Sequence, residues 1–233
     1  MKPVFERSTS REVEFQTLLD QFAALLFAEG ILVTAYTGSK PRHFMALDTS
    51  HQQQTLENFR RYVEVCQEVV AQGIGLRDDK MLAWRMFQKM KVHPPSDLMQ
   101  EIRQGEVIEI YNSDFVQTFR NMRFFEICSY PLDELLCRPF WELVYREESI
   151  TQMIVHQASR LLSGTVSGLF QFDIPEHSIF EIESPGRNVM VVKQRIGAPL
   201  LGSDGAPAAL IAFLHVSACV RMAGVTTDPP EVH

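Results

Sequence analysis

The sequence lacks the features that mark several large classes of protein. Its 233 residues carry a formal charge of −7, so its overall field repels nucleic acid and anionic lipid. The most basic stretch, residues 80–91, is interleaved with methionine, leucine and phenylalanine at helical spacing, which is typical of a solvated helix face. No run approaches the roughly 18 apolar residues of a membrane span. We therefore expect neither a nucleic-acid nor a membrane partner.

Catalytic and metal-binding signatures are missing as well. The chain has no GxSxG nucleophile elbow, no GxxxxGK[ST] phosphate loop, no HExxH pair and no GxGxxG fingerprint. Adjacent acids such as Asp133–Glu134 and Glu147–Glu148 would point apart on a helix, so they do not suggest a two-carboxylate site. The sequence predicts a protein that is not an enzyme. A catalytic site assembled from separate segments remains the alternative.

The four cysteines are too few and too scattered to predict a metal site or a disulfide framework. Cys66, Cys128, Cys137 and Cys219 form no CxxC pair, which indicates reduced, mostly buried thiols. The first residues also lack the apolar run of a signal peptide. A cytoplasmic location is the resulting expectation.

Hydrophobic residues make up 45% of the chain and sixteen residues are Phe, so a sizeable core can form. Residues 1–104 are predicted to be mainly helical. Apolar residues repeat at helical spacing over 15–26 and 56–70, and Asp78 is placed to cap a third helix that ends at Pro94–Pro95. Two short β-like runs within residues 31–47, separated by a Gly- and Pro-containing segment, predict a small hairpin.

The periodicity changes at Gly105. Residues 107–111 and 115–119 predict a hairpin, and residues 121–149 predict short helices broken at Pro131 and Pro139. A longer helix is expected from about residue 150 to 162, followed by β-rich segments at 168–182, 188–196 and 208–217. We therefore predict an α+β protein with a second unit at 105–220 and a flexible tail at 221–233.

This order of elements resembles the PAS family, and two local segments strengthen the likeness. Residues 121–136 are similar to the stretch in which an Asn closes the second strand, an aromatic-rich helix follows, and a Gly-Tyr-Ser-x-Glu-Glu-Leu pattern opens the next helix. Here Ser129-Tyr130 replaces Gly-Tyr. Residues 138–144 resemble the family's Gly-x-Pro-Phe-x-Glu-Leu-Val segment. The resemblance covers about half of the chain and implies a five-stranded antiparallel sheet that wraps flanking helices around a hydrophobic interior.

In the PAS family that interior holds a small ligand in some members and is filled by side chains in others, and both readings stay open. The resemblance implies a lining made mostly of aromatic residues. The candidates are Phe124, Phe125, Cys128, Phe140, Trp141, His156, Phe170, Phe180 and Phe213. Haem-bearing members use an axial His on or near the longer helix, where His156 is expected, although nothing around it marks a haem pocket. The Asn-Cys-Arg-Phe-Leu-Gln motif of the light-sensing members is missing, so a flavin photoadduct is not expected.

The functional expectation is a regulatory protein whose PAS-like unit senses a small apolar ligand or a protein partner. No effector signature accompanies the sensor, so its output would pass through protein contacts, with the N-terminal helices as a relay and a homodimer as the expected assembly. The alternative is a non-enzymatic adaptor whose PAS-like unit is a closed docking surface. Fold alone does not decide between them.

Overall fold

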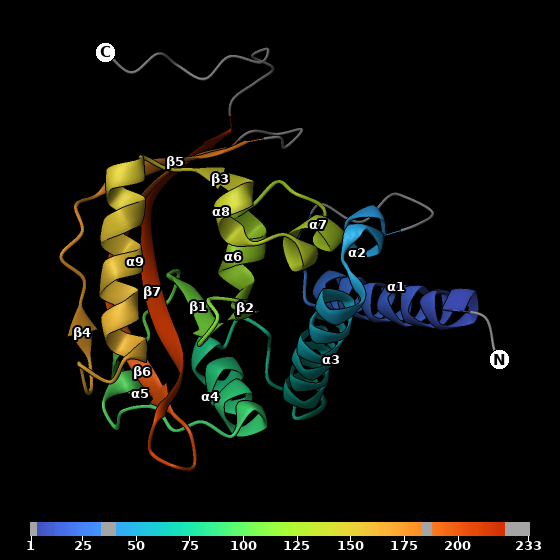
Figure 1. Cartoon of the computed structure of the whole chain (residues 1–233), viewed down its shortest axis with the longest axis horizontal. Coiled ribbons are helices and arrows are strands. Elements are labelled where there is room, and N and C mark those ends of the chain that lie inside the picture. The colour runs from blue at the N-terminus through green and yellow to red at the C-terminus, as the bar shows by residue number, and fades with distance from the viewer. Residues whose placement is uncertain (1–3, 34–40, 183–187, 222–233) are drawn as a thin grey trace.

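The N-terminal part of the protein is helical. A computed structural model describes residues 4–33, 41–182 and 188–221 (Figure 1). Asp78 accepts a hydrogen bond from the backbone N–H of Met81 at 2.9 Å and caps a helix, as predicted. In chain order the helices are α1 (Val4–Ala28), α2 (Arg42–Ala46), α3 (Thr49–Ala71), α4 (Asp79–Met90) and α5 (Leu98–Glu101).

The prediction of a strand at residues 43–47 is wrong. This segment forms the single-turn helix α2, and residues 31–33 form no strand. Residues 34–40, which hold most of the predicted turn, lie outside the described residues. The ring of Phe44 is buried and stacks on Phe15 with centroids 4.2 Å apart. The side-chain amide of Gln52 donates hydrogen bonds to the carbonyls of Phe44 and Leu47. Tertiary packing of one aromatic ring thus overrides the local β-like pattern.

The C-terminal part combines helices with an antiparallel sheet, as the sequence predicted. Its helices are α6 (Met122–Ile127), α7 (Leu132–Cys137), α8 (Phe140–Leu143) and α9 (Glu148–Leu162). Its strands are β1 (Val107–Asn112), β2 (Gln117–Arg120), β3 (Val144–Tyr145), β4 (Phe170–Gln171), β5 (His177–Glu181), β6 (Asn188–Leu201) and β7 (Pro207–Arg221). The predicted tail beyond residue 221 lies outside the described residues.

Within the described residues these strands form one sheet in the order β2-β1-β7-β6-β5-β3, with β4 paired to residues 196 and 197 of β6. β6 and β7 form a long hairpin in which the register shifts three times. Such irregularities bend a strand and increase its twist, and the sheet curls around α9 (Figure 1). Five of the seven strands are the predicted ones, and the two-residue strand β4 lies within the predicted β-rich segment 168–182. The two-residue strand β3 at the edge of the sheet was not predicted.

Alternate residues of the strands point to two different faces of this sheet. Ile108 pairs with Phe213, and Ile110 pairs with Ile211, on what we call the outer face. Glu109 pairs with Ala212 on the opposite, inner face, which α9 covers (Figure 1). All four of the named outer-face residues have no exposed surface.

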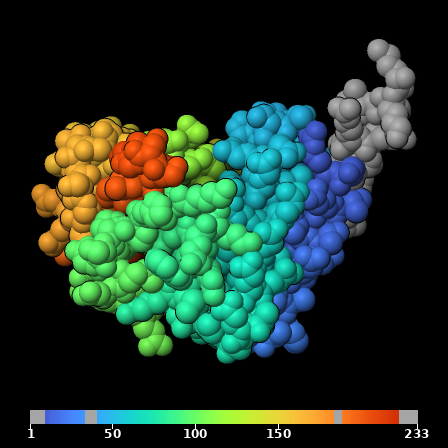
Figure 2. All heavy atoms as spheres, turned by 90° about the horizontal axis from the view of Figure 1, so that it is seen from below, coloured from blue at the N-terminus to red at the C-terminus, as the bar shows by residue number. Residues whose placement is uncertain are grey.

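The helical N-terminal part packs against the rest of the molecule. The ring of Tyr62 in α3 meets the rings of Phe119 and Phe125, with centroids 5.5 and 6.3 Å apart. Its hydroxyl donates a hydrogen bond to the carbonyl of Arg120 at 2.5 Å. In the view from below, the green segment that contains α4 and α5 lies between the blue N-terminal helices and the orange strand segments (Figure 2). One buried hydrophobic cluster therefore runs through both parts, while the division into two units at residue 104 stays a prediction.

Candidate ligand-binding site

A cavity of about 310 Å³ lies between α9 and the inner face of the sheet. Its volume is at the lower end of the range of small-molecule pockets, about 300–1,000 Å³. Trp141 and Val155 are about half exposed and mark where it meets solvent. The lining residues are Glu109, Tyr111, Phe115, Phe140, Trp141, Arg146, Thr151, Ile154, Val155, Ala158, Phe172, Gln194, Leu210 and Ala212.

Small side chains on facing elements leave this space open. Ala158 lies on α9, and Ala212 lies on β7, so neither element fills the gap between them. The end of the cavity is closed more tightly, because Phe172 packs against Gly197, the register partner of Ala212. A Cβ atom on Gly197 would lie 2.7 Å from the Phe172 ring. The hollow is thus local, and close packing surrounds it.

A buried carboxylate forms the polar part of the cavity wall. Glu109 is 5% exposed, and its Oε1 accepts a hydrogen bond from Nε2 of Gln117 at 2.8 Å. Burial raises the pKa of Glu109, while the nearby Arg120 and Arg146 act in the opposite direction. Burial likewise raises the pKa of Tyr111, whose hydroxyl interacts with Glu109.

Two arginines flank this carboxylate, and they differ in how well they are held. Arg120 is 6% exposed, donates from Nη1 to the carbonyl of Leu135 at 2.7 Å, and lies 4.6 Å from the centre of the Phe124 ring. Arg146 lies 5.8 Å from the centre of the Phe140 ring, and its buried Nε has no hydrogen-bond partner in the described part of the chain. Burial lowers the pKa of both guanidinium groups.

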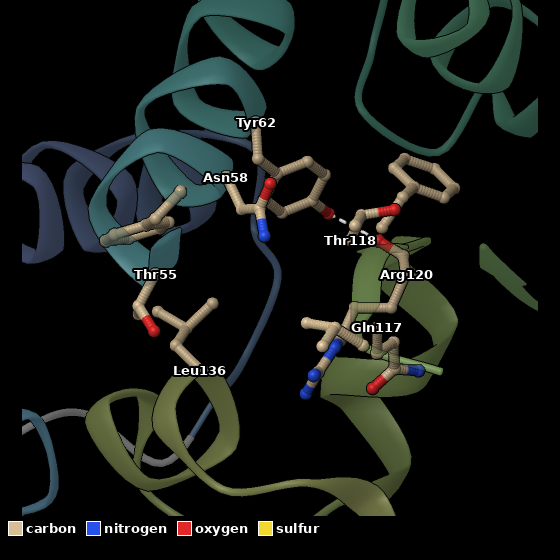
Figure 3. A pocket seen from close by; sticks show the side chains of 10 residues that line it. Thr55, Asn58, Tyr62, Gln117, Thr118, Arg120 and Leu136 are labelled. Carbon is tan, nitrogen blue, oxygen red and sulfur yellow. Dashed lines mark hydrogen bonds between the residues drawn. The ribbon is translucent and has the colours of Figure 1, made fainter. Parts of the chain in front are cut away.

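A much smaller cavity lies behind Arg120, between α3, β2 and α7 (Figure 3). Its volume is about 50 Å³, which is room for water rather than for an organic ligand. Asn58 and Tyr62 reach it from α3, and Gln117 and Arg120 reach it from β2. Gln117 lies between the two cavities, because it lines the small one and its Nε2 bonds Glu109 of the large one.

The structure separates the nine residues that the sequence suggested as pocket lining. Phe140 and Trp141 line the cavity. Phe124, Phe125 and Cys128 are buried in the main core, and Phe213 is buried on the outer face. His156 is on the exposed side of α9, Phe170 packs beside Phe172, and Phe180 packs against Tyr145. These last seven residues do not line the cavity.

Sequence reasoning missed the polar residues of the site. Glu109 alternates with Ile108 and Ile110 in a strand whose two faces are both covered. A charged residue at the inward position of such a strand is rare unless it has partners, and this was the available signal. Gln194 gives a similar signal, since it follows the buried Val192 on the inner face of β6.

The described residues contain no group of three His, Cys, Asp or Glu side chains that could hold a metal ion. The four cysteines are free, and burial raises the pKa of the Cys66, Cys128 and Cys137 thiols. No helix in the described ranges combines the length and apolar character that crossing a membrane requires.

Comparisons with known proteins assign no family to the chain. No family model matches the chain, and no curated protein matches it. Eight chains of known structure match. One is the crystal structure of a sensory box sensor histidine kinase from Vibrio cholerae, with a TM-score of 0.33, 13% identity, and coverage of 53% of this chain and 89% of that chain.

The C-terminal part is PAS-like. The strand order, the curled antiparallel sheet and the flanking helices carry this description of the fold. The likeness to the kinase structure adds nothing to it, because the TM-score is too low. In this PAS-like part, the cavity lies between the sheet and the longest helix.

Proposed function

We propose that this protein is a sensory module that binds a small, largely apolar molecule between α9 and the inner face of the sheet. The observation that carries the proposal is the cavity itself. Its walls are mainly apolar, and it contains a few buried polar groups that can orient a ligand. These features are typical of a binding site rather than of a packed core.

The output would pass to the N-terminal helices through direct contact. Glu109 bonds Gln117, and Gln117 and Arg120 lie on the same short strand. The carbonyl of Arg120 accepts the hydrogen bond from Tyr62 of α3. A ligand that displaces Glu109 would therefore shift the strand on which α3 rests. We propose that the module has no catalytic activity and that it forms a homodimer. Its signal would pass to a separate protein partner.

A pair of tryptophan substitutions on α9 tests the binding site. Ala158 lines the cavity, and His156 lies two residues earlier on the exposed side of the same helix. We expect A158W to fill the cavity and abolish binding, and H156W to bind as the parent protein does. The measurements are native mass spectrometry and solvent extraction of the purified protein, followed by a thermal-shift screen of small apolar compounds.

The same mass spectra report the oligomeric state, and a dimer is the expected result. A parent protein that carries no extractable compound and is stabilised by none in the screen would overturn the sensory role and leave the adaptor role. Equal binding by A158W and H156W would place the ligand elsewhere.

A further inference from the structure

The ligand's chemistry can be narrowed from the groups that the cavity leaves without partners, an inference that rests on the proposed function. Arg146 follows β3 directly and faces inward, since the neighbouring Val144 is buried and Tyr145 is exposed. Glu109 acts on the charge of Arg146 from a distance, but among the described residues its guanidinium forms no ion pair and its Nε has no hydrogen-bond acceptor. A largely buried arginine that has no ion-pair partner of its own is costly, because burial removes its hydration.

Within the part of the chain that the structure describes, two guanidinium groups share the one carboxylate of the cavity wall, although only Arg146 itself lines the cavity. Glu109 on β1 is the carboxylate of the lining, and it faces two guanidinium groups, Arg120 from β2 and Arg146 from the β3 end. Arg120 is already held by the Leu135 carbonyl and the Phe124 ring. The remaining positive charge is on Arg146, at the wall of the cavity. A bound anion would compensate it.

The side-chain amide of Gln194 is a second polar group of the cavity wall, and its oxygen lacks a hydrogen-bond partner across the described ranges. Gln194 is 7% exposed and lines the cavity, and its Oε1 makes no hydrogen bond within the described residues. Buried side-chain amides are almost always hydrogen-bonded. In this orientation the oxygen needs a donor, such as a hydroxyl or an amide N–H of a ligand or water. If the amide were turned over, its N–H would stand in that place and could donate to a carboxylate.

The remaining residues of the cavity wall indicate the polarity and the size of the rest of the ligand. Phe140, Ile154, Phe172 and Leu210 offer only apolar surface. Because a water molecule occupies about 30 Å³ of liquid, a cavity of about 310 Å³ matches roughly ten non-hydrogen atoms. That is the size of a medium-chain fatty acid or of an acid with a single aromatic ring.

We infer that the cavity takes a small carboxylic acid, with its carboxylate on Arg146 and its apolar body between α9 and the sheet. A guanidinium group donates to a carboxylate through charge-assisted hydrogen bonds. The polar head would then lie beside Glu109 and Gln194, and the apolar chain would reach Ala158 and Phe172.

Matched acids and amides test the inference. The probes are octanoate and 3-phenylpropionate, with octanamide and 3-phenylpropanamide as neutral partners of the same body, measured by isothermal titration calorimetry on the full chain. We expect each acid to bind at least tenfold more tightly than its amide. The substitution R146Q should lower acid affinity at least tenfold and change amide affinity less than twofold.

Two further variants keep the result interpretable. R146K keeps the charge and should retain part of the preference for acids. R160Q removes an arginine of α9 that lies over Phe170 outside the cavity, and it should bind both probe types as the parent does. R146Q should fold at least as well as the parent, since it removes a largely buried charge that has no ion-pair partner of its own and leaves Arg120 beside Glu109. Its melting temperature checks this.

Three results would overturn the inference. They are amides that bind as tightly as acids, an R146Q variant that keeps its acid affinity, and a parent protein that binds neither acid. The sensory role itself would survive the first two, and it would survive the third if extraction yields a neutral compound that A158W no longer retains. Loss of both acid binding and any extractable compound would remove both proposals.

Discussion

The two faces of the sheet are built from the same strands, yet one is solid and the other is hollow. On the outer face Ile108, Ile110 and Phe213 have no exposed surface and belong to the main core. On the inner face, one residue along in each strand, Glu109 and Ala212 line a cavity of about 310 Å³. Alternation along a strand is enough to produce this difference.

The comparison shows how one sheet can serve stability and recognition together. The outer face joins the sheet to the N-terminal part, and its large side chains provide the burial that stabilises the fold. The inner face uses small residues at the centre of the cavity and polar residues on its wall. The inner face therefore makes fewer stabilising packing contacts than the outer face, and the unfilled space can hold a ligand.

The largest predicted effect comes from removing a large side chain from the tightly packed outer face. Phe213 is fully buried, and F213A should lower the free energy of unfolding by about 3–5 kcal/mol because it leaves a cavity. Urea denaturation measures the change. F180A makes the same change at a partly exposed ring and should cost less than half as much. An F213A loss below about 1 kcal/mol would contradict a tightly packed outer face.

A smaller effect separates the hollow part of the inner face from its closed end. Gly197 and Ala212 are register partners on β6 and β7. A methyl group on Gly197 would lie 2.7 Å from the Phe172 ring, so G197A should destabilise the protein by about 1–3 kcal/mol.

A212V serves as the matched variant, because its extra methyl groups enter the cavity. We expect it to change stability by less than about 1 kcal/mol, in either direction. Melting temperatures of both variants give the comparison. Equal losses would show that the inner face is packed throughout and that the cavity is closed in solution.

Much of the fold could be predicted from the sequence, because it depends on local patterns. The apolar repeats gave the long helices, and the change of period at Gly105 gave the sheet. Asn121, the residue that the PAS resemblance placed at the end of the second strand, ties several elements together. Its Oδ1 accepts from the backbone N–H of Ile108 at 3.0 Å, and its Nδ2 donates to Asp79 and to the carbonyl of Glu106.

The site was harder to predict, because it depends on which face each residue occupies. Phe213 and Ala212 are adjacent in sequence, and only the pairing of β7 with β1 and β6 shows that Ala212 faces α9. Aromatic residues were expected to line the pocket, but most of them pack the core. The predicted hairpin at residues 31–47 failed for a related reason, since a five-residue segment is too short for its period to decide between strand and helix.

The smallest predicted effect is a pH dependence of stability. It concerns the carboxyl group of Asp79, at the start of α4 in the helical N-terminal part. Burial raises the pKa of Asp79 to about 6, and the hydrogen bond from Asn121 acts in the opposite direction. The folded protein therefore holds this proton more tightly than the unfolded chain does, and the contribution of Asp79 to stability falls as pH rises from about 4 to about 6. D79N keeps an oxygen acceptor for Asn121 and removes the titration.

We expect D79N and the parent protein to differ little in stability at pH 4 and to diverge as the pH rises. The variant should be more stable by about 1 kcal/mol at pH 7, after allowance for the exposed part of the group. Urea denaturation at several pH values measures the difference. D48N should show the opposite sign, because hydrogen bonds from His51 lower the pKa of Asp48 and stabilise its charged form at neutral pH. Parallel pH profiles for D79N and the parent would mean that Asp79 is hydrated in solution and that the contact between α4 and the end of the β1–β2 hairpin is open.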